Sequence, residues 1–233
     1  MAIEHRVAGH LGVAAEEYDR TIRTFIPNYE RMISTIVHWV DGNVPAGGLV
    51  VDLGAGTGAL SSAILDALPH VRVQLVDVDP NMLEVAATRC SAHSGRYELR
   101  HARFEDQLPR CHAVVASLAL HHVATQAEKQ ELYRAILTAL EPAGLVVVGD
   151  ALVHSEGLER DRILDDLYAH MESNGISAAA ARAHFTQWGE EDVYVSLPDE
   201  LALMAAAGFP HPDCFWRDGL IAVYGASKTG DAA

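Results

Sequence analysis

LVVDLGAGTG, residues 49–58, joins a short apolar run directly to three closely spaced glycines. An apolar run of this length that ends at glycine is typical of a strand buried inside a parallel sheet. A helical pattern over 59–68 follows at once. Glycine suits the turn between them, because it adopts backbone angles that other residues avoid and lets a ligand approach the main chain closely. The segment therefore predicts a ligand-binding turn between a buried strand and a helix.

Strands and helices alternate after this turn. Strand patterns at 71–78, 97–102, 113–120 and 145–151 are separated by helical patterns at 80–90 and 126–140. The last third of the chain has helical patterns at 155–174, 177–186 and 198–207, followed by a hairpin over 213–224. Short connections between alternating strands and helices favour an α/β fold, with a parallel sheet covered on both faces.

The same patterns predict the division of the chain. Two helical patterns between 14 and 40 meet at Pro27, and 1–13 has the character of a loosely held arm. We find no internal repeat or linker, so we predict one domain over 1–233. Its parts would be a helical arm or lid (1–45), a ligand-binding core (46–151), a helical substrate insertion (152–195) and a C-terminal helix with a hairpin (196–226).

The composition excludes several classes of protein. Hydrophobic residues make up 49% of the chain and charged residues 21%, which excludes wholesale disorder. Lys and Arg number 17 against 32 Asp and Glu, a net charge of -15 that argues against nucleic acids and anionic membranes as partners. The N-terminus has no signal-peptide core and no apolar run is long enough to span a bilayer, so we expect a cytoplasmic protein. The cysteines Cys90, Cys111 and Cys214 lie too far apart to suggest a disulfide framework.

Two aspartates indicate which kind of ligand the turn binds. Dinucleotide-binding turns use the spacing G-x-G-x-x-G, with a pyrophosphate at the start of the helix. This chain has G-x-G-x-G, and Asp52 precedes the first glycine, where a carboxylate would repel a pyrophosphate but can orient a cationic amino group. Asp77 ends the second predicted strand and can accept both hydroxyls of a ribose. Val78 and Met82 then offer an apolar rim on which an adenine could lie.

Two segments together resemble a known family. VVDLGAGTG (50–58) and LVDVDPNMLEVA (75–86) are similar to motifs I and II of the class I S-adenosylmethionine-dependent methyltransferases. The resemblance extends over nearly the whole chain, including LEPAGLVVVGD at 140–150. It implies a Rossmann-like fold with a mostly parallel seven-stranded sheet, a C-terminal antiparallel hairpin, helices on both faces and an N-terminal helical lid. It also implies S-adenosylmethionine as cofactor, and we expect a small-molecule acceptor, in keeping with the acidic composition.

The resemblance carries over to individual positions. It places the methionine part of the cofactor on Gly54, Ala55 and Gly56, and the ribose on Asp77. Arg103 and Phe104 occupy the loop that flanks the adenine, where the family often has an aspartate, and Ser117 follows the fourth strand. The predicted cofactor site is therefore Tyr29, Asp52, Gly54, Ala55, Gly56, Asp77, Val78, Met82, Arg103, Phe104 and Ser117.

A second resemblance concerns the N-terminal segment. YDRTIR (18–23) and IPNY (26–29) are similar to the corresponding part of carboxy-S-adenosylmethionine synthases, enzymes of tRNA wobble-uridine modification. In that family the tyrosine matching Tyr29 touches the cofactor, and a cation–π contact of this kind contributes about 0.5–2 kcal/mol. The family's asparagine after strand four is Ser117 here. Its carboxylate-binding arginine has only a distant counterpart, Arg182, which requires a gap.

Alternative functions therefore stay open. The favoured function is methyl transfer to a small-molecule acceptor, with specialised metabolism as the expected setting. The alternative is an enzyme that converts S-adenosylmethionine itself, by carboxylation of the sulfonium ylide or by cyclisation that releases methylthioadenosine. A sensor that binds the cofactor without catalysis is a third reading. The helical arm and the insertion could also form a homodimer contact.

His121 and His122 are the candidate catalytic residues. They follow the fourth predicted strand, at the sheet edge where ligands of open α/β sheets bind, and either could act as a general base. Successive side chains of an extended backbone point to opposite faces, so only one could point inward. We see no third ligand at a recognisable spacing and expect no metal site.

The insertion after the fifth strand offers the remaining candidates. The residues that could line an acceptor pocket are Asp150, His154, Tyr168, His170, His184 and Trp188, most of which we expect to serve helix packing. The acidic run Glu190-Glu191-Asp192 is expected to be a solvated turn rather than a cation site.

Overall fold

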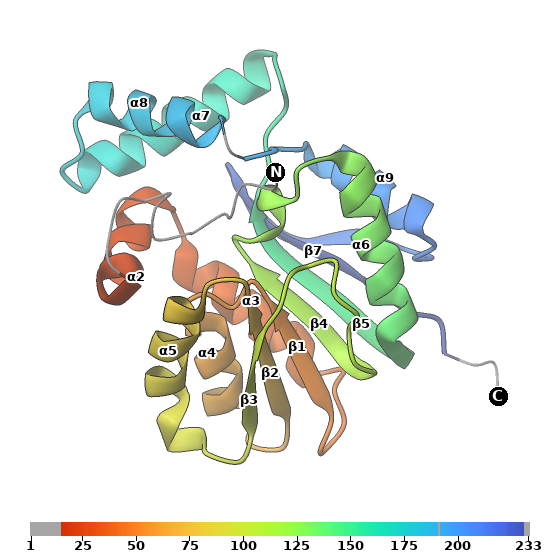
Figure 1. Cartoon of the computed structure of the whole chain (residues 1–233). Helices are drawn as coiled ribbons and strands as arrows, with labels where there is room; N and C mark the ends of the chain where they lie inside the picture. The colour runs from red at the N-terminus through yellow and green to blue at the C-terminus, as the bar shows by residue number, and fades with distance from the viewer. Residues whose placement is uncertain (1–14, 191, 231–233) are drawn as a thin grey trace.

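The computed structural model in Figure 1 describes residues 15–190 and 192–230. The arm proposed for 1–13 therefore lies outside the described residues. Within this part of the chain one sheet has the strand order β3-β2-β1-β4-β5-β7-β6. The strands are β1 (Leu49–Leu53), β2 (Arg72–Asp77), β3 (Tyr97–His101), β4 (Cys111–Ser117), β5 (Leu140–Ala151), β6 (Asp213–Asp218) and β7 (Ile221–Ser227).

The direction of the strands confirms the predicted fold class. The strands from β3 to β5 run parallel, whereas β7 is antiparallel to both β5 and β6. β1 pairs with β2 on one side and with β4 on the other, and its Val50 and Val51 are fully buried. Val50 packs into the apolar cluster on one face and Val51 into the cluster on the opposite face. This two-sided burial explains why β1 is apolar at every position except Asp52.

Helices cover both faces of the sheet (Figure 1). One face carries α3 (Tyr29–Asp41), α4 (Ala59–Ala67) and α5 (Pro80–Arg89), and the other carries α6 (Gln126–Ala139) and α9 (Leu197–Ala207). α3 approaches β5 very closely, since a Cβ on Gly149 would lie 2.6 Å from Cγ of Met32. The absence of a side chain at Gly149 is therefore what lets α3 rest directly on the sheet.

The remaining helices form a layer beyond one end of the sheet. α2 (Ala15–Phe25) lies with α7 (Leu158–Ser173) and α8 (Ala178–Trp188), as Figure 1 shows. The ring of Phe25 meets the rings of His184 and Trp188 edge-on, with centroids 5.1 and 5.2 Å apart. The N-terminal helix and the insertion therefore pack as one unit, separated in sequence but joined by aromatic contacts. None of the described helices is both long enough and apolar enough to cross a bilayer.

A buried ion pair joins the two helices on the second face. Nζ of Lys129 on α6 donates to Oε2 of Glu200 on α9 at 3.1 Å, and both side chains are almost fully buried. The hydroxyl of Tyr133 donates to the other oxygen of Glu200, and the Tyr224 hydroxyl of β7 lies 3.3 Å from that of Tyr133. These four side chains satisfy one another's polar groups inside an apolar layer.

Two predicted boundaries are wrong. The strand predicted over 113–120 ends at Ser117, because Leu118 adopts a φ of 51° and the chain then forms a 3-10 turn over Leu120–His122. β5 begins at Leu140 rather than at Leu145, because Leu140 already pairs with Cys111 across an irregularity in the ladder. The first difference matters for function, since it decides how the two histidines are presented.

Replacing Gly225 by Ala should destabilise the sheet. A Cβ at this position in β7 would lie 2.0 Å from the carbonyl oxygen of Val146 on β5, so the strands must separate. We expect a loss of about 1–3 kcal/mol in the free energy of unfolding, measured by urea denaturation. Gly42→Ala is the matched control, because nothing lies within 4 Å of its added Cβ, and it should change stability by less than about 0.5 kcal/mol. Equal stability of the two variants would contradict the described approach of the strands.

Candidate functional site

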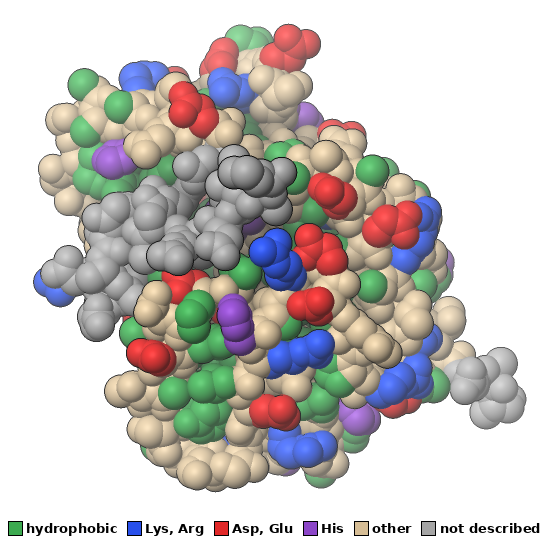
Figure 2. Space-filling view, viewed as in Figure 1, with side chains coloured by type: hydrophobic (Ala, Val, Ile, Leu, Met, Phe, Trp, Pro, Cys, Tyr) green, Lys and Arg blue, Asp and Glu red, His purple; other side chains and the backbone are tan. Residues whose placement is uncertain are grey.

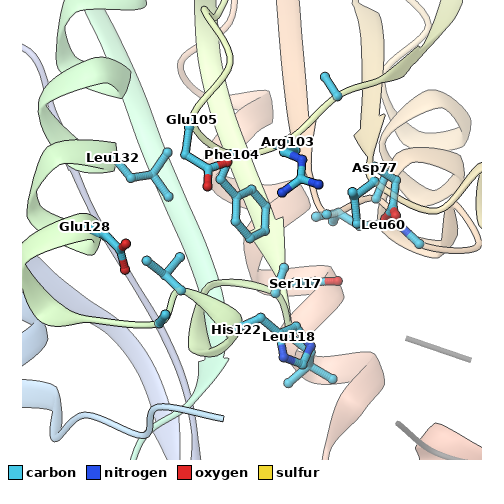
Figure 3. A pocket seen from close by; sticks show the side chains of 18 of the residues that line it. Leu60, Asp77, Arg103, Phe104, Glu105, Ser117, Leu118, His122, Glu128 and Leu132 are labelled. Atoms are coloured by element: carbon cyan, nitrogen blue, oxygen red, sulfur yellow. Dashed lines mark hydrogen bonds between the residues drawn. The ribbon is translucent and has the colours of Figure 1, made fainter. Parts of the chain in front are cut away.

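A cavity of about 910 Å³ opens beside the ends of β1, β2 and β4 (Figure 3). Its walls come from the glycine turn, the end of β2, the loop after β3, the end of β4 and one face of α6. The volume lies near the upper end of the range of roughly 300–1,000 Å³ that is usual for sites of small ligands. The cavity also occupies the edge of the sheet where open α/β folds bind their ligands.

Most residues of the predicted cofactor site line this cavity. Those that do are Tyr29, Gly54, Ala55, Gly56, Asp77, Val78, Arg103, Phe104 and Ser117. Figure 3 shows Arg103, Phe104 and Ser117 directed into it, with Asp77 at one end. Asp52 and Met82 are not among the lining residues, and both are buried, with exposed fractions of 1% and 0%.

The glycine turn is shaped for close approach of a ligand. Gly54, Gly56 and Gly58 all have positive φ, at 70°, 53° and 76°. A Cβ on Gly54 would lie 2.5 Å from Cβ of Ala119, and one on Gly58 would lie 2.9 Å from Cβ of Ala86. Gly56 differs, because nothing lies within 4 Å of its added Cβ. Two glycines are therefore required by packing, while Gly56 exposes its main chain to the cavity.

Asp77 fastens the glycine turn to the neighbouring strand. Its Oδ2 accepts the backbone N–H of Gly56 at 2.7 Å, and its Oδ1 accepts that of Asp79 at 2.8 Å. Burial raises the pKa of Asp77, although these two hydrogen bonds oppose the shift. Each carboxylate oxygen can accept a second hydrogen bond, so the side chain can hold the turn and still accept the hydroxyls of a diol.

Asp52 lies buried beneath the turn, with one carboxylate oxygen bonded and the other without a partner. Oδ2 accepts the hydroxyl of Ser61 at 2.6 Å, whereas Oδ1 has no hydrogen bond among the described groups. Burial raises the pKa of Asp52 to about 7, the Ser61 bond lowers it, and the nearby carboxylate of Asp77 raises it further. A buried carboxylate with a free oxygen favours a cationic group next to it.

The N-terminal lid is fixed to the same turn. The hydroxyl of Thr57 donates to Oδ1 of Asp19 at 2.7 Å, and Arg89 of α5 forms an ion pair with the same carboxylate. The ring of Tyr29 lines the cavity and has the guanidinium of Arg23 5.1 Å from its centroid. Burial raises the pKa of Tyr29 to about 12, so its hydroxyl stays protonated.

The structure separates the two candidate histidines. His121 is buried and does not line the cavity, and its Nδ1 lies 2.5 Å from Oδ1 of Asp150. Burial opposes a charge on its ring, but the carboxylates of Asp150 and Asp192 outweigh it and raise the pKa of His121. His122 does line the cavity, and its Nδ1 lies 2.9 Å from Oδ1 of Asp192. A role in proton transfer stays a prediction for both, and the geometry favours His122.

Two expectations about this region need correction. The backbone is not extended at the histidines, so the rings lie on the same side, with centroids 4.2 Å apart. Asp192 is not part of a solvated turn: its carboxylate is buried and accepts the hydroxyl of Tyr194 at 2.8 Å. Glu190 is exposed as expected, and Glu191 lies outside the described residues. Asp192 was missed because it reaches the histidines from a segment that is distant in the sequence. The apolar and aromatic residues after it, Val193-Tyr194-Val195, were the signal that this segment is buried.

The cavity also has a wall that the sequence did not indicate. Ala127, Glu128, Glu131, Leu132 and Ala135 of α6 line it, and Figure 3 shows Glu128 and Leu132 opposite Phe104. Their spacing of three to four residues is the signal that could have identified them. Among the described lining residues none comes from α7 or α8.

The insertion candidates instead contact other parts of the protein. His184 and Trp188 pack against Phe25, and Nε2 of His170 lies 3.2 Å from the carbonyl oxygen of Arg23. Tyr168 carries the guanidinium of Arg182 over its ring at 4.5 Å. His154, like these residues, is not among those that line the cavity. Tyr168, His170, His184 and Trp188 therefore serve helix packing in this structure.

Comparison with known proteins agrees with this geometry. Residues 51–146 match the family model of a methyltransferase domain. A carboxy-S-adenosyl-L-methionine synthase of Shigella sonnei is 24% identical over an aligned length of 236 residues, gaps included. The match covers 94% of this chain and 90% of the relative. An uncharacterized methyltransferase of Geobacillus kaustophilus is 24% identical over an aligned length of 204 residues. This match covers 77% of this chain and 90% of the relative.

Solved structures share the fold at low sequence identity. An O-methyltransferase family protein from Burkholderia thailandensis aligns with a TM-score of 0.68 at 18% identity, covering 94% of this chain and 60% of the other. Human N-acetylserotonin methyltransferase, solved with S-adenosylmethionine, aligns with a TM-score of 0.59 at 17% identity, covering 97% and 63%. The chain thus spans less than two thirds of each of these two structures.

The fold, the glycine turn and the match to the methyltransferase domain all indicate the same class of protein. The chain carries a class I S-adenosylmethionine-dependent methyltransferase domain and is an enzyme of that class. Its cofactor is S-adenosylmethionine. The residues present fit this cofactor, since the unpartnered oxygen of Asp52 suits an ammonium group, Gly56 leaves its main chain open, and Asp77 borders the cavity.

Replacing Asp52 by Asn should change how stability depends on pH. The folded wild type keeps a proton on Asp52 up to about pH 7, whereas the unfolded chain loses it near pH 4, so wild-type stability falls as the pH rises between these values. Relative to wild type, Asp52→Asn should gain about 2–3 kcal/mol between pH 5 and pH 7, measured by urea unfolding of the ligand-free protein. Ser61→Ala keeps the carboxyl group but removes a hydrogen bond that lowers its pKa, so its stability should still fall between pH 5 and pH 7 and should go on falling at higher pH. Parallel stability curves for wild type and Asp52→Asn would show that the carboxylate is not buried as described.

Proposed function

We propose that this enzyme transfers a methyl group from S-adenosylmethionine to a small-molecule acceptor. The observation that carries the proposal is the extent of the cavity, which continues from the glycine turn past Phe104 to α6. The part next to α6 is bordered by Val123, Leu132 and Ala135, in addition to Phe104. This second part, which Glu105, Glu128 and Glu131 also line, gives an acceptor room beside the cofactor within the same cavity.

The first part of the cavity provides the groups that the cofactor needs. Asp52 would balance the charge of its amino group from below the turn, and the open main chain of Gly56 would approach its methionine part. Asp77 would accept the ribose hydroxyls, each charge-assisted hydrogen bond contributing about 1.5–3 kcal/mol. Val78 and Phe104 would flank the adenine. These roles rest on the positions of the residues around the cavity.

The protein's contribution to the reaction is alignment. The cofactor supplies an activated methyl group, so the chain has to hold the acceptor atom in line with the bond that breaks. Good alignment can contribute roughly 7–11 kcal/mol to lowering the barrier. Phe104 and Leu132 would hold the acceptor from opposite sides of the cavity. A base is required only for an acceptor that must lose a proton.

The charges around the cavity favour a small acceptor over a nucleic acid. Glu105, Glu128 and Glu131 line the acceptor side, and carboxylates there would repel a phosphate backbone. On the face seen in Figure 2, acidic and basic side chains are interspersed rather than gathered by sign. The net charge of -15 acts in the same direction. A cytoplasmic location and a homodimer stay predictions.

Conversion of S-adenosylmethionine itself is the second candidate. The similarity to carboxy-S-adenosyl-L-methionine synthases over 94% of the chain favours it, as does the position of Tyr29 in the cavity wall. The arginine that such a reaction uses to hold a carboxylate is the difficulty. Arg182, the candidate from the sequence, lies on α8 with its guanidinium over the ring of Tyr168 and does not line the cavity. Among the described residues that line the cavity, Arg103 is the one arginine. Methyl transfer therefore stays the favoured function.

Replacing Asp77 by Ala should weaken cofactor binding. Loss of one or two charge-assisted hydrogen bonds corresponds to a decrease in affinity of roughly 10- to 10,000-fold, and the loosened glycine turn acts in the same direction. Calorimetric titration with S-adenosylmethionine and with S-adenosylhomocysteine measures the effect. Asp66→Ala, an exposed carboxyl on α4, is the control and should bind like wild type. Unchanged affinity in Asp77→Ala would remove the ribose assignment.

The products formed from S-adenosylmethionine distinguish the two candidate functions. We expect S-adenosylhomocysteine to accumulate only when a library of small nucleophiles is added, together with a product heavier by one methylene, both detected by mass spectrometry. Formation of methylthioadenosine without an acceptor would instead establish the alternative, as would a carboxylated sulfonium formed with prephenate, the carboxyl source of the carboxy-S-adenosylmethionine synthases. A heat-treated sample controls for breakdown of the cofactor.

A further inference from the structure

A compact group of nitrogen and oxygen ligands lies next to the cavity. His121, His122 and Asp192 each place one ligand atom within 4.8 Å of the other two. Nε2 of His121 lies 3.8 Å from Oδ2 of Asp192, and Nδ1 of His122 lies 2.9 Å from Oδ1 of the same carboxylate. The side chains are 11%, 13% and 1% exposed. Three ligand atoms are thus gathered where little water reaches them.

Neighbouring groups orient two of these ligands. Oδ1 of Asp150 lies 2.5 Å from Nδ1 of His121, which leaves Nε2 of that ring directed at Asp192. Asp150 is itself held by the backbone N–H groups of His121 and Ala151. The hydroxyl of Tyr194 donates to Oδ2 of Asp192. A histidine bonded through one nitrogen to a buried carboxylate, with its other nitrogen facing further ligands, is the arrangement that surrounds histidines in metal sites.

We propose that His121, His122 and Asp192 bind a divalent transition metal ion, with zinc as the best fit. Two imidazoles and one carboxylate are the ligand set of three-coordinate protein sites for zinc, which leave a further position open. Ligand atoms bound tetrahedrally at about 2.0–2.2 Å lie roughly 3.3–3.6 Å from one another. The separations of 2.9 and 3.8 Å run to the two different oxygens of Asp192, and the three ligand atoms lie within 4.8 Å of one another, so the side chains have to draw together to close around an ion.

The site would join two distant parts of the chain. The N–H of Val193 already donates to the carbonyl oxygen of His121 at 2.8 Å, so the segment after α8 runs along the turn that follows β4. An ion would strengthen this link and would lie behind the part of the cavity wall that His122 forms. The sequence expectation of no metal rested on the lack of a third ligand, which Asp192 provides. The proposal concerns ion binding alone, and it can fail without affecting the proposed methyl transfer.

Zinc titration of metal-free protein tests the proposal. The full chain is treated with a chelator, dialysed, and titrated with zinc in a calorimeter at about pH 7.5, with cobalt as a second probe whose visible absorption reports a site with nitrogen ligands. We expect a high-affinity site for one ion per chain. His122→Gln and Asp192→Asn should each weaken it at least 10-fold. Asp150→Asn keeps all three ligands and should weaken it about 10- to 100-fold, because it removes the group that orients His121.

A histidine outside the cluster provides the matched control. Nε2 of His93 also lies against a carboxylate, 2.8 Å from Oδ1 of Asp66. Within the described part of the chain, however, this pair has no third ligand residue close enough to complete a metal site. His93→Gln should therefore bind zinc like wild type. Circular dichroism and binding of S-adenosylhomocysteine establish that each variant is folded. Wild type that takes up no ion, or folded His122→Gln and Asp192→Asn variants that bind as tightly as wild type, would overturn the proposal.

Discussion

The carboxylate of Asp77 connects the parts of the structure on which the site depends. It accepts one backbone N–H from the glycine turn after β1 and one from the turn after β2, and so fixes two loops with a single side chain. Asp79, held in this way, caps α5 by accepting the N–H of Asn81 at 2.9 Å. The start of α5, the shape of the glycine turn and one end of the cavity therefore share one group. A change at Asp77 would act on all three at once.

The enzyme keeps a second carboxylate close by in an unfavourable environment. Asp52 is buried with one oxygen unpaired, and Asp77 lies near enough to raise its pKa further. Such a group destabilises the ligand-free protein, and a bound cation relieves it. The buried charges on the opposite face behave differently, because Lys129 and Glu200 already neutralise each other. Asp52 thus keeps an unsatisfied oxygen beneath the glycine turn, while the Lys129–Glu200 pair between α6 and α9 is satisfied.

Local sequence patterns were enough to predict most of the fold. The apolar run and glycines of 49–58 predicted β1 and its turn, and Asp77 was placed correctly at the end of β2 because a strand and a helix-starting Pro80 flank it. What the sequence could not supply were contacts between distant segments. The positive φ of Leu118 reorients both histidines, and the burial of Asp192 depends on where the segment after α8 returns. The cavity wall formed by α6 was missed for the same reason. The sequence pattern of α6 predicts a helix, but it does not show which face packs on the sheet and which face borders the cavity.

The attachment of α2 to the glycine turn rests on contacts that salt weakens. Asp19 binds Thr57 and Arg89 through polar contacts that are partly exposed, at 21% for its own side chain and 27% for that of Arg89. Thr57 also borders the cavity, so these contacts join α2 to the cavity wall. Partly exposed ion pairs contribute little to stability and weaken in salt. The hold of α2 on this part of the cavity wall is therefore sensitive to ionic strength.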